Sequence, residues 1–197
     1  MVIQGTKLLH WNYFLALESD FEHLSRYIEF SKDNYKAYSL EMAHLLLASA
    51  SEVDVVLKGI CKKINLVKNP RNIDKYREIV KPVYPKLCSM KVLIPRYGLE
   101  ITPWQRWKKK YKKNPNPHWW TAYNDVKHDR GNEFKKANLK NTISAITGLY
   151  VVLLYYYYDE AENGELIPSP SLLRPEGACD CTFSDSYMEF GINYLLL

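Results

Sequence analysis

The sequence contains little glycine, and this shortage excludes several familiar loops. Only 8 of its 197 residues are glycine, and none belongs to a glycine-rich loop that could cradle a nucleotide phosphate. The chain also lacks the Gly-x-Ser-x-Gly elbow of serine hydrolases and the aspartate-rich loop that binds calcium. A function that depends on one of these loops is therefore not expected.

Cysteine is scarce as well, with four residues in the chain. Their spacing matches neither a disulfide framework nor a Cys-x-x-Cys redox pair, and no second ligand pair accompanies Cys179 and Cys181. We therefore expect reduced thiols, no metal site and no cofactor. The first residues carry no charged stretch followed by an apolar one, so we expect no signal peptide and a cytoplasmic location.

Long uncharged stretches are limited to one segment. Residues 141–158 carry no charge, but they include asparagine, threonine and serine and end in four tyrosines. A membrane span needs about 20 predominantly apolar residues. The segment is therefore predicted to be a buried core helix, and no membrane partner is expected.

Charge is unevenly distributed along the chain. The net charge is +5, and residues 159–197 contain eight acids and a single base, Arg174. This acidic segment carries −7, which leaves +12 for residues 1–158. One interpretation is that the acidic segment covers basic surface until a nucleic acid displaces it.

The densest basic run is interleaved with aromatic side chains. A pattern of this kind suits phosphates together with stacked bases, so we predict a nucleic-acid-binding segment. The alternative is a solvated loop whose charge answers that of the acidic segment. The predicted nucleic-acid-binding residues are Arg106, Lys108, Lys109, Lys110, Lys112 and Lys113.

Apolar residues recur at helical spacing through most of the chain. They predict an all-α protein, an antiparallel helical bundle whose core pair is formed by residues 39–64 and 133–159. Pro82 and Pro85 interrupt the third predicted helix. The predicted helices cover about residues 12–29, 39–64, 72–88, 119–128 and 133–159.

The sequence divides into a bundle domain and an appendage. Residues 1–159 are predicted to form the bundle domain, with an irregular basic insertion at about 91–118 that begins with a short strand. Residues 160–197 are predicted to form an acidic C-terminal appendage, either irregular or a small β-hairpin, because prolines are followed by short alternating stretches.

The segment around residue 124 contains the densest group of chemically active side chains. On a helix, Asn124 and His128 are four residues apart and are expected to share a face. His128 could exchange a proton near neutral pH, and Lys127 or Arg130 could hold a phosphate. These four residues are the candidate catalytic set. The alternative is that His128 and Arg130 only cap the C-terminus of a helix.

A second polar group lies on the predicted central helix. Asp54 and Lys58 are four residues apart in the favourable acid-before-base order, and Glu52 precedes them. A buried Asp54 would need a cation, which Lys127 or Arg130 could supply. The alternative is an intrahelical surface salt bridge. We predict that Glu52, Asp54, Lys58 and Tyr123 form a network that supports the catalytic set.

Residues 39–58 and 123–130 resemble the two core segments of the HEPN superfamily, prokaryotic helical bundles found in toxin–antitoxin and phage-defence systems. The family motif places an arginine, usually followed by a polar residue, about five positions before a histidine. Asn124 and His128 match the last two positions, whereas Tyr123 occupies the position of the arginine.

In active members of the family, the resemblance implies metal-independent RNA cleavage at a homodimer interface. There the histidine and arginine of two protomers promote attack of the 2′-hydroxyl on the adjacent phosphate. Non-catalytic members bind nucleotides, RNA or partner proteins. The sequence therefore predicts a HEPN-like RNA-binding or RNA-cleaving homodimer, with a cognate antitoxin or other protein as a further partner. The alternative is a non-catalytic interaction module whose polar cluster is structural, because a phenol cannot replace a guanidinium.

Overall fold

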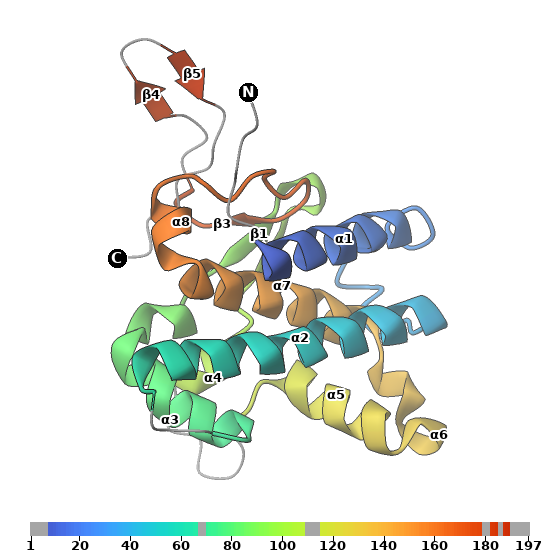
Figure 1. Ribbon diagram of the computed structural model, residues 1–197. Coiled ribbons are helices and arrows are strands. Elements are labelled where there is room, and N and C mark those ends of the chain that lie inside the picture. The colour runs from blue at the N-terminus through green and yellow to red at the C-terminus, as the bar shows by residue number, and fades with distance from the viewer. Residues whose placement is uncertain (1–7, 67–69, 109–114, 179–181, 185–186, 190–197) are drawn as a thin grey trace.

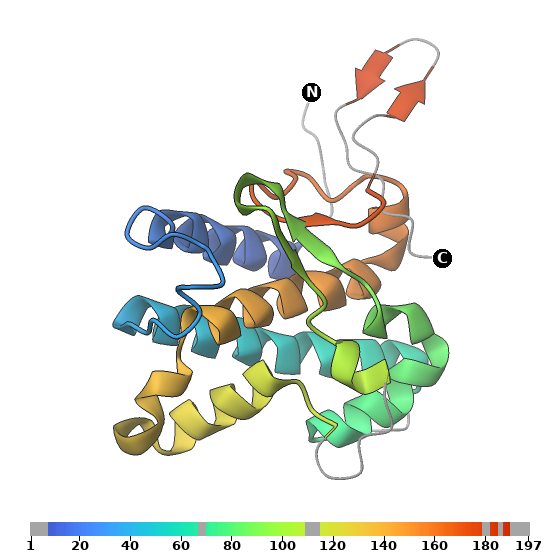
Figure 2. The ribbon, with the colours of Figure 1, turned by 180° about the vertical axis from the view of Figure 1, so that it is seen from behind.

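The computed structural model of the protein describes residues 8–66, 70–108, 115–178, 182–184 and 187–189. These residues are mainly helical, and a small antiparallel sheet lies across one face of the helices, the face that Figure 2 shows in front (Figures 1 and 2). The α-helices are α1 (Leu9–Leu24), α2 (Leu40–Ile64), α3 (Ile73–Val83), α4 (Gln105–Lys108), α5 (His118–His128), α6 (Arg130–Glu133), α7 (Leu139–Tyr156) and α8 (Tyr158–Glu162).

Helices α2 and α7 form the centre of the bundle, as the sequence predicts. They run parallel to each other. Near their N-termini the Thr142 hydroxyl donates to the carbonyl of Met42 at 3.1 Å, and near their C-termini Gly59 packs against the ring of Tyr156. Only α1 and α5 run in the opposite direction (Figure 1). The antiparallel bundle is therefore wrong for the central pair, because the long connection through α3, the sheet and α5 returns the chain to the end where α2 begins.

The central helices begin at side chains that cap them. The Ser39 hydroxyl accepts from the backbone N–H of Met42 at 3.1 Å at the start of α2. The Oδ1 of the Asn138 side chain accepts from the backbone N–H of Asn141 at 3.1 Å at the start of α7. Helix α7 therefore begins at Leu139 and not near Glu133 as predicted, and α6 and a short 3₁₀ turn (Phe134–Lys136) fill the interval.

The two central helices are buried to different extents. Every residue of α7 from Ala145 to Tyr155 is buried, whereas α2 buries only one side, which includes Leu46 and Leu57. The prediction of a core helix over 141–158 is confirmed. Among the described helices, none combines the length and the apolar character that a membrane span requires.

Two predicted outer helices are shorter than expected. Helix α1 ends at Leu24 and not near residue 29. Helix α3 ends at Val83, and a 3₁₀ turn (Pro85–Cys88) follows it. Pro85 has no backbone N–H and cannot continue the α3 hydrogen-bond ladder, which accounts for this second stop.

The small sheet corrects the all-α prediction to a mainly α fold. Strands β1 (Val92–Ile94), β2 (Leu99–Ile101) and β3 (Arg174–Pro175) pair in the order β2-β1-β3, and all pairs are antiparallel. Strand β1 confirms the strand expected at the start of the basic insertion. A separate hairpin of β4 (Thr182–Ser184) and β5 (Tyr187–Glu189) confirms the hairpin expected near the C-terminus.

Part of the acidic segment packs on the bundle. Glu18 of α1 is 2% exposed, and its carboxylate accepts from three consecutive backbone N–H groups, those of Ser171, Leu172 and Leu173, at 2.9, 2.8 and 3.0 Å. Beyond this contact, Glu176 pairs with Lys91 at 3.1 Å. Within the described residues, the acidic segment thus packs on α1 and β1.

Candidate functional site

Helix α5 carries most of the predicted site, and buried tryptophans fix its first turn. The Trp119 indole lies against Gly148 of α7, where an added Cβ would come within 2.8 Å of the ring. Its Nε1–H donates to the carbonyl of Pro103 at 3.1 Å, while the Trp104 Nε1–H donates to Gly148 at 3.0 Å. A side chain on Gly148 would therefore displace the start of α5. Two cavities flank this turn.

The first cavity, here the α5 cleft, has a volume of about 420 Å³ and lies between α5, the start of α3 and the middle of α2. It brings together four of the predicted residues. The other six lining residues belong to no local sequence motif. The lining residues are Asp54, Tyr123, Asn124 and Lys127 together with Arg71, Asn72, Ile73, Asn116, Trp120 and Thr121.

Asp54 does not meet the cation that was expected from α5. Its carboxylate pairs with Lys58, which confirms the intrahelical salt bridge, and it also accepts from the Tyr76 hydroxyl at 2.8 Å. Burial and the Asp54 hydrogen bond raise the pKa of Tyr76 above its usual range, so the phenol stays a donor. Asp54 is thus already satisfied from α2 and α3.

The cations of the cleft have no acidic partner. The Lys127 ammonium donates to the Tyr123 hydroxyl at 3.3 Å. Within the part of the chain that the structure describes, neither Lys127 nor Arg71 forms an ion pair with a carboxylate. Since Asp54 is engaged elsewhere, the α5 cleft presents uncompensated positive charge.

The amide of Asn124 is held by its own helix. Its Nδ2–H donates to the carbonyl of Trp120 at 2.9 Å, which fixes the side chain in the cleft wall. Trp120 and Tyr123 also line the cleft, but they are 7% and 6% exposed, so only a small part of each is accessible. The cleft therefore combines amides, two mostly buried aromatic side chains and two cations.

His128 and Arg130 lie apart from the cleft. Both are exposed, His128 in the last turn of α5 and Arg130 at the start of α6, and neither lines the cavity that contains Asn124. The expectation that Asn124 and His128 act together from one face is therefore not met in a single copy. His128 lies in the last turn of α5, where the capping alternative places it, whereas Arg130 is the first residue of α6.

Glu52 belongs to a different neighbourhood. Its carboxylate oxygen lies 2.5 Å from the Nδ1 of His10 on α1, and the two side chains are only 15% and 21% exposed. Glu52 is thus removed from the predicted supporting network, because it faces α1 while Asp54 faces α3. The scattered position of His10 in the sequence gave no signal of this pair.

The predicted basic run is described in part. Arg106 and the exposed Lys108 belong to α4, whereas Lys109, Lys110, Lys112 and Lys113 lie outside the described residues. Arg106 lines the second cavity, here the Arg106 pocket, which has a volume of about 190 Å³. Its Nη1–H donates to the Nε2 of His118 at 2.8 Å.

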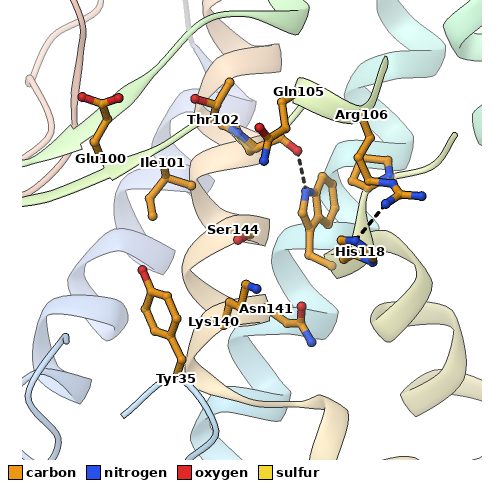
Figure 3. A pocket seen from close by; sticks show the side chains of 13 residues that line it. Tyr35, Glu100, Ile101, Thr102, Gln105, Arg106, His118, Lys140, Asn141 and Ser144 are labelled. Atoms are coloured by element: carbon orange, nitrogen blue, oxygen red, sulfur yellow. Dashed lines mark hydrogen bonds between the residues drawn. The ribbon is translucent and has the colours of Figure 1, made fainter. Parts of the chain in front are cut away.

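The Arg106 pocket contains two basic residues that the sequence did not reveal as site residues, His118 and Lys140. Figure 3 shows Arg106 and His118 on one side of the pocket and Tyr35 on the other, with Lys140 and Ser144 of α7 between them. Partial removal of the His118 ring from water, then the charges of Arg106 and Lys140, lowers its pKa. His118 is therefore neutral at neutral pH.

No metal-binding cluster is present in the described part of the chain, where no three His, Cys, Asp or Glu side chains gather suitably. No family model matches the chain, and searches of curated proteins and of solved structures find no match either.

Proposed function

We propose that the protein binds RNA and that the α5 cleft holds part of a single strand. The observation that carries this proposal is that one cavity is lined by Arg71 and Lys127, two cations without an acidic partner in the described residues, together with the aromatic residues Trp120 and Tyr123. Cations bind phosphates, and aromatic side chains offer apolar contact to bases.

The size and lining of the cleft suit one unstacked nucleotide. Its volume of about 420 Å³ lies in the range of small-molecule pockets. Side-chain amides at Asn72 and Asn124 can donate to or accept from base edges. The +12 charge of residues 1–158 would attract the rest of the strand to the surrounding surface.

RNA binding is tested by fluorescence anisotropy with a labelled single-stranded RNA over a range of salt concentrations. Replacing Lys127 or Arg71 by glutamine should weaken binding several-fold and reduce the salt slope by about one in each variant. Lys135→Gln, an exposed lysine outside both cavities, is the matched control. Equal losses in all three variants would contradict a role of the cleft.

A second candidate function is metal-independent RNA cleavage by a homodimer, as the HEPN resemblance implies. The observation that favours it is the exposure of His128 and Arg130 outside the cleft, where both are accessible to a second copy. His128 would then exchange the proton of the 2′-hydroxyl while Arg130 stabilises the phosphate. In a prokaryotic defence or toxin–antitoxin system, an antitoxin would cover this surface.

Cleavage is tested by incubating the protein and His128→Ala with total RNA in the presence of a metal chelator. Degradation by the parent protein alone supports the second function. If both preparations leave the RNA intact while RNA binding persists, the protein is a binding module and the candidate catalytic set is not catalytic. Because His128 is exposed, its replacement should change the unfolding free energy by less than about 0.5 kcal/mol.

A further inference from the structure

The Arg106 pocket is separate from the α5 cleft and has its own chemistry. Its three basic side chains come from three helices: Arg106 from α4, His118 from the start of α5 and Lys140 from the first turn of α7. Their convergence is fixed by the Trp119 and Trp104 contacts on α7 and needs no ligand to form. We propose that this pocket binds a phosphate group that is free or terminal, such as a phosphomonoester.

The charge balance of the pocket favours an anion. Glu100 is the only acidic residue among those that line it, and the Glu100 carboxylate pairs at 3.0 Å with Lys91. Lys140 forms no ion pair with any described carboxylate. Arg106 and Lys140 are permanent cations that line the same pocket, and a phosphate dianion would match their charge.

Size and hydrogen bonding also indicate a phosphate group. The volume of about 190 Å³ is below that of typical pockets for drug-sized ligands, so it suits a small anion better than a whole nucleotide. The Tyr35 and Ser144 hydroxyls face the pocket as further donors (Figure 3). Burial raises the pKa of Tyr35, which keeps that phenol protonated.

Anion binding in the Arg106 pocket is expected to be linked to protonation of the His118 ring. A guanidinium can only donate, so the 2.8 Å contact with Arg106 makes the His118 Nε2 an acceptor and places the proton of the neutral ring on Nδ1. The charged or titratable groups around the ring are Arg106, Lys140, Glu100 and Tyr35. A bound anion offsets the first two, so it should raise the pKa of His118 and favour proton uptake.

The experiment follows the His118 ring resonances by NMR while inorganic phosphate is added to the full-length protein. Chloride at the same ionic strength is the reference. We expect a saturable shift with phosphate and none with chloride, and a higher apparent pKa of His118 at saturation. A linear drift of equal size with both salts would overturn the proposal.

Variants separate this site from the cleft. Lys140→Gln should weaken the phosphate response about tenfold, because one charge-assisted contact is lost, whereas Lys140→Arg and the neighbouring control Lys135→Gln should retain it. A Lys140→Gln variant that folds, as judged by the rest of the spectrum, and binds phosphate as well as the parent would also overturn the proposal. The Arg71→Gln/Lys127→Gln double variant should keep the His118 response, whatever happens to RNA binding.

The source of the phosphate is distinguished with two RNA oligonucleotides of one sequence, one with and one without a 5′-phosphate. A saturable His118 shift with the phosphorylated strand assigns the pocket to an RNA end. A shift with inorganic phosphate and with neither strand assigns it to a free small phosphate. No shift with any of the three probes would overturn the proposal.

Discussion

Two carboxylates are held in different ways: Glu18 at the contact between α1 and the acidic segment, and Asp54 at the α5 cleft. Glu18 is 2% exposed and accepts three backbone N–H groups. The Asp54 side chain is 28% exposed, pairs with Lys58 and accepts from Tyr76. The buried Glu18 carboxylate accepts only from backbone N–H groups, so it holds the acidic segment in place on α1. The partly exposed Asp54 carboxylate lies in the wall of a cleft that also contains two cations. We therefore expect Glu18 to control stability and the cleft to control binding.

The largest expected effect is that of Glu18→Leu. It would leave three backbone N–H groups without an acceptor, of which those of Leu172 and Leu173 are buried, and we expect a loss of about 3 kcal/mol in the free energy of unfolding. Chemical denaturation followed by circular dichroism measures it. Glu22→Ala removes a half-exposed carboxylate of the same helix that pairs with Arg96; it is the control and should cost less than about 1 kcal/mol. Similar values for the two variants would remove the distinction between the regions.

The pH dependence of stability provides a second test of the contribution of Glu18. Desolvation raises the pKa of Glu18 above its ordinary value of 4.5, and the backbone hydrogen bonds only partly oppose this shift. A raised folded-state pKa means that the contribution of Glu18 is complete below the unfolded pKa and is lost as the pH rises through the folded one. The stability of the parent protein relative to Glu18→Gln should therefore be greater at pH 4 than at pH 7. An opposite trend would show that the hydrogen bonds outweigh desolvation.

An intermediate effect is expected at Gly148, which packs against Trp119 in the first turn of α5. The Cβ of Gly148→Ala would lie 2.8 Å from the buried Trp119 ring, so we expect a loss of about 2 kcal/mol and weaker RNA binding through displacement of α5. Gly59→Ala is the matched control. Its Cβ would also approach a ring, that of Tyr156, but that ring is half-buried and can move. Equal losses in thermal melts of both variants would contradict this view of α5.

The smallest expected effect is that of Asp54→Ala. The Lys58 pair is exposed and screened by solvent, so the loss should be about 1 kcal/mol and should come mainly from the unpaired Tyr76 hydroxyl. Asp54→Asn keeps an acceptor for Tyr76 and should recover most of the stability. If Asp54→Ala destabilised the protein as much as Glu18→Leu, the polar cluster would be structural, as in the interaction-module alternative.

Local patterns predicted the helices and the contacts within them. The Asp54–Lys58 pair and the Ser39 start of α2 depend on residues three or four positions apart, which a helix places side by side whatever surrounds it. The α7 core helix follows from its apolar composition in the same way. By contrast, the start of α7 at Leu139 was missed, because the Asn138 cap competes with the good helix-forming residues before it.

The candidate site was predictable only where it follows one helix. Tyr123, Asn124 and Lys127 could be grouped from their spacing on α5, but the periodicity could not show that His128 lies beyond the cleft. Arg71, which precedes α3, joins them only through the packing of α3 and α5 on α2. The Arg106 pocket had no sequence signal at His118 or Lys140, since its three basic side chains come from separate segments.

Composition and spacing up to four residues act within one element, so they were enough to predict the mainly helical character, the buried helix α7 and the separation of a basic body from an acidic segment. Long-range contacts were needed to establish that α2 and α7 run parallel, that Glu18 anchors the acidic segment, and that the basic side chains form two cavities. These features depend on contacts between residues far apart in the chain, and such contacts are selected by the packing of the whole core.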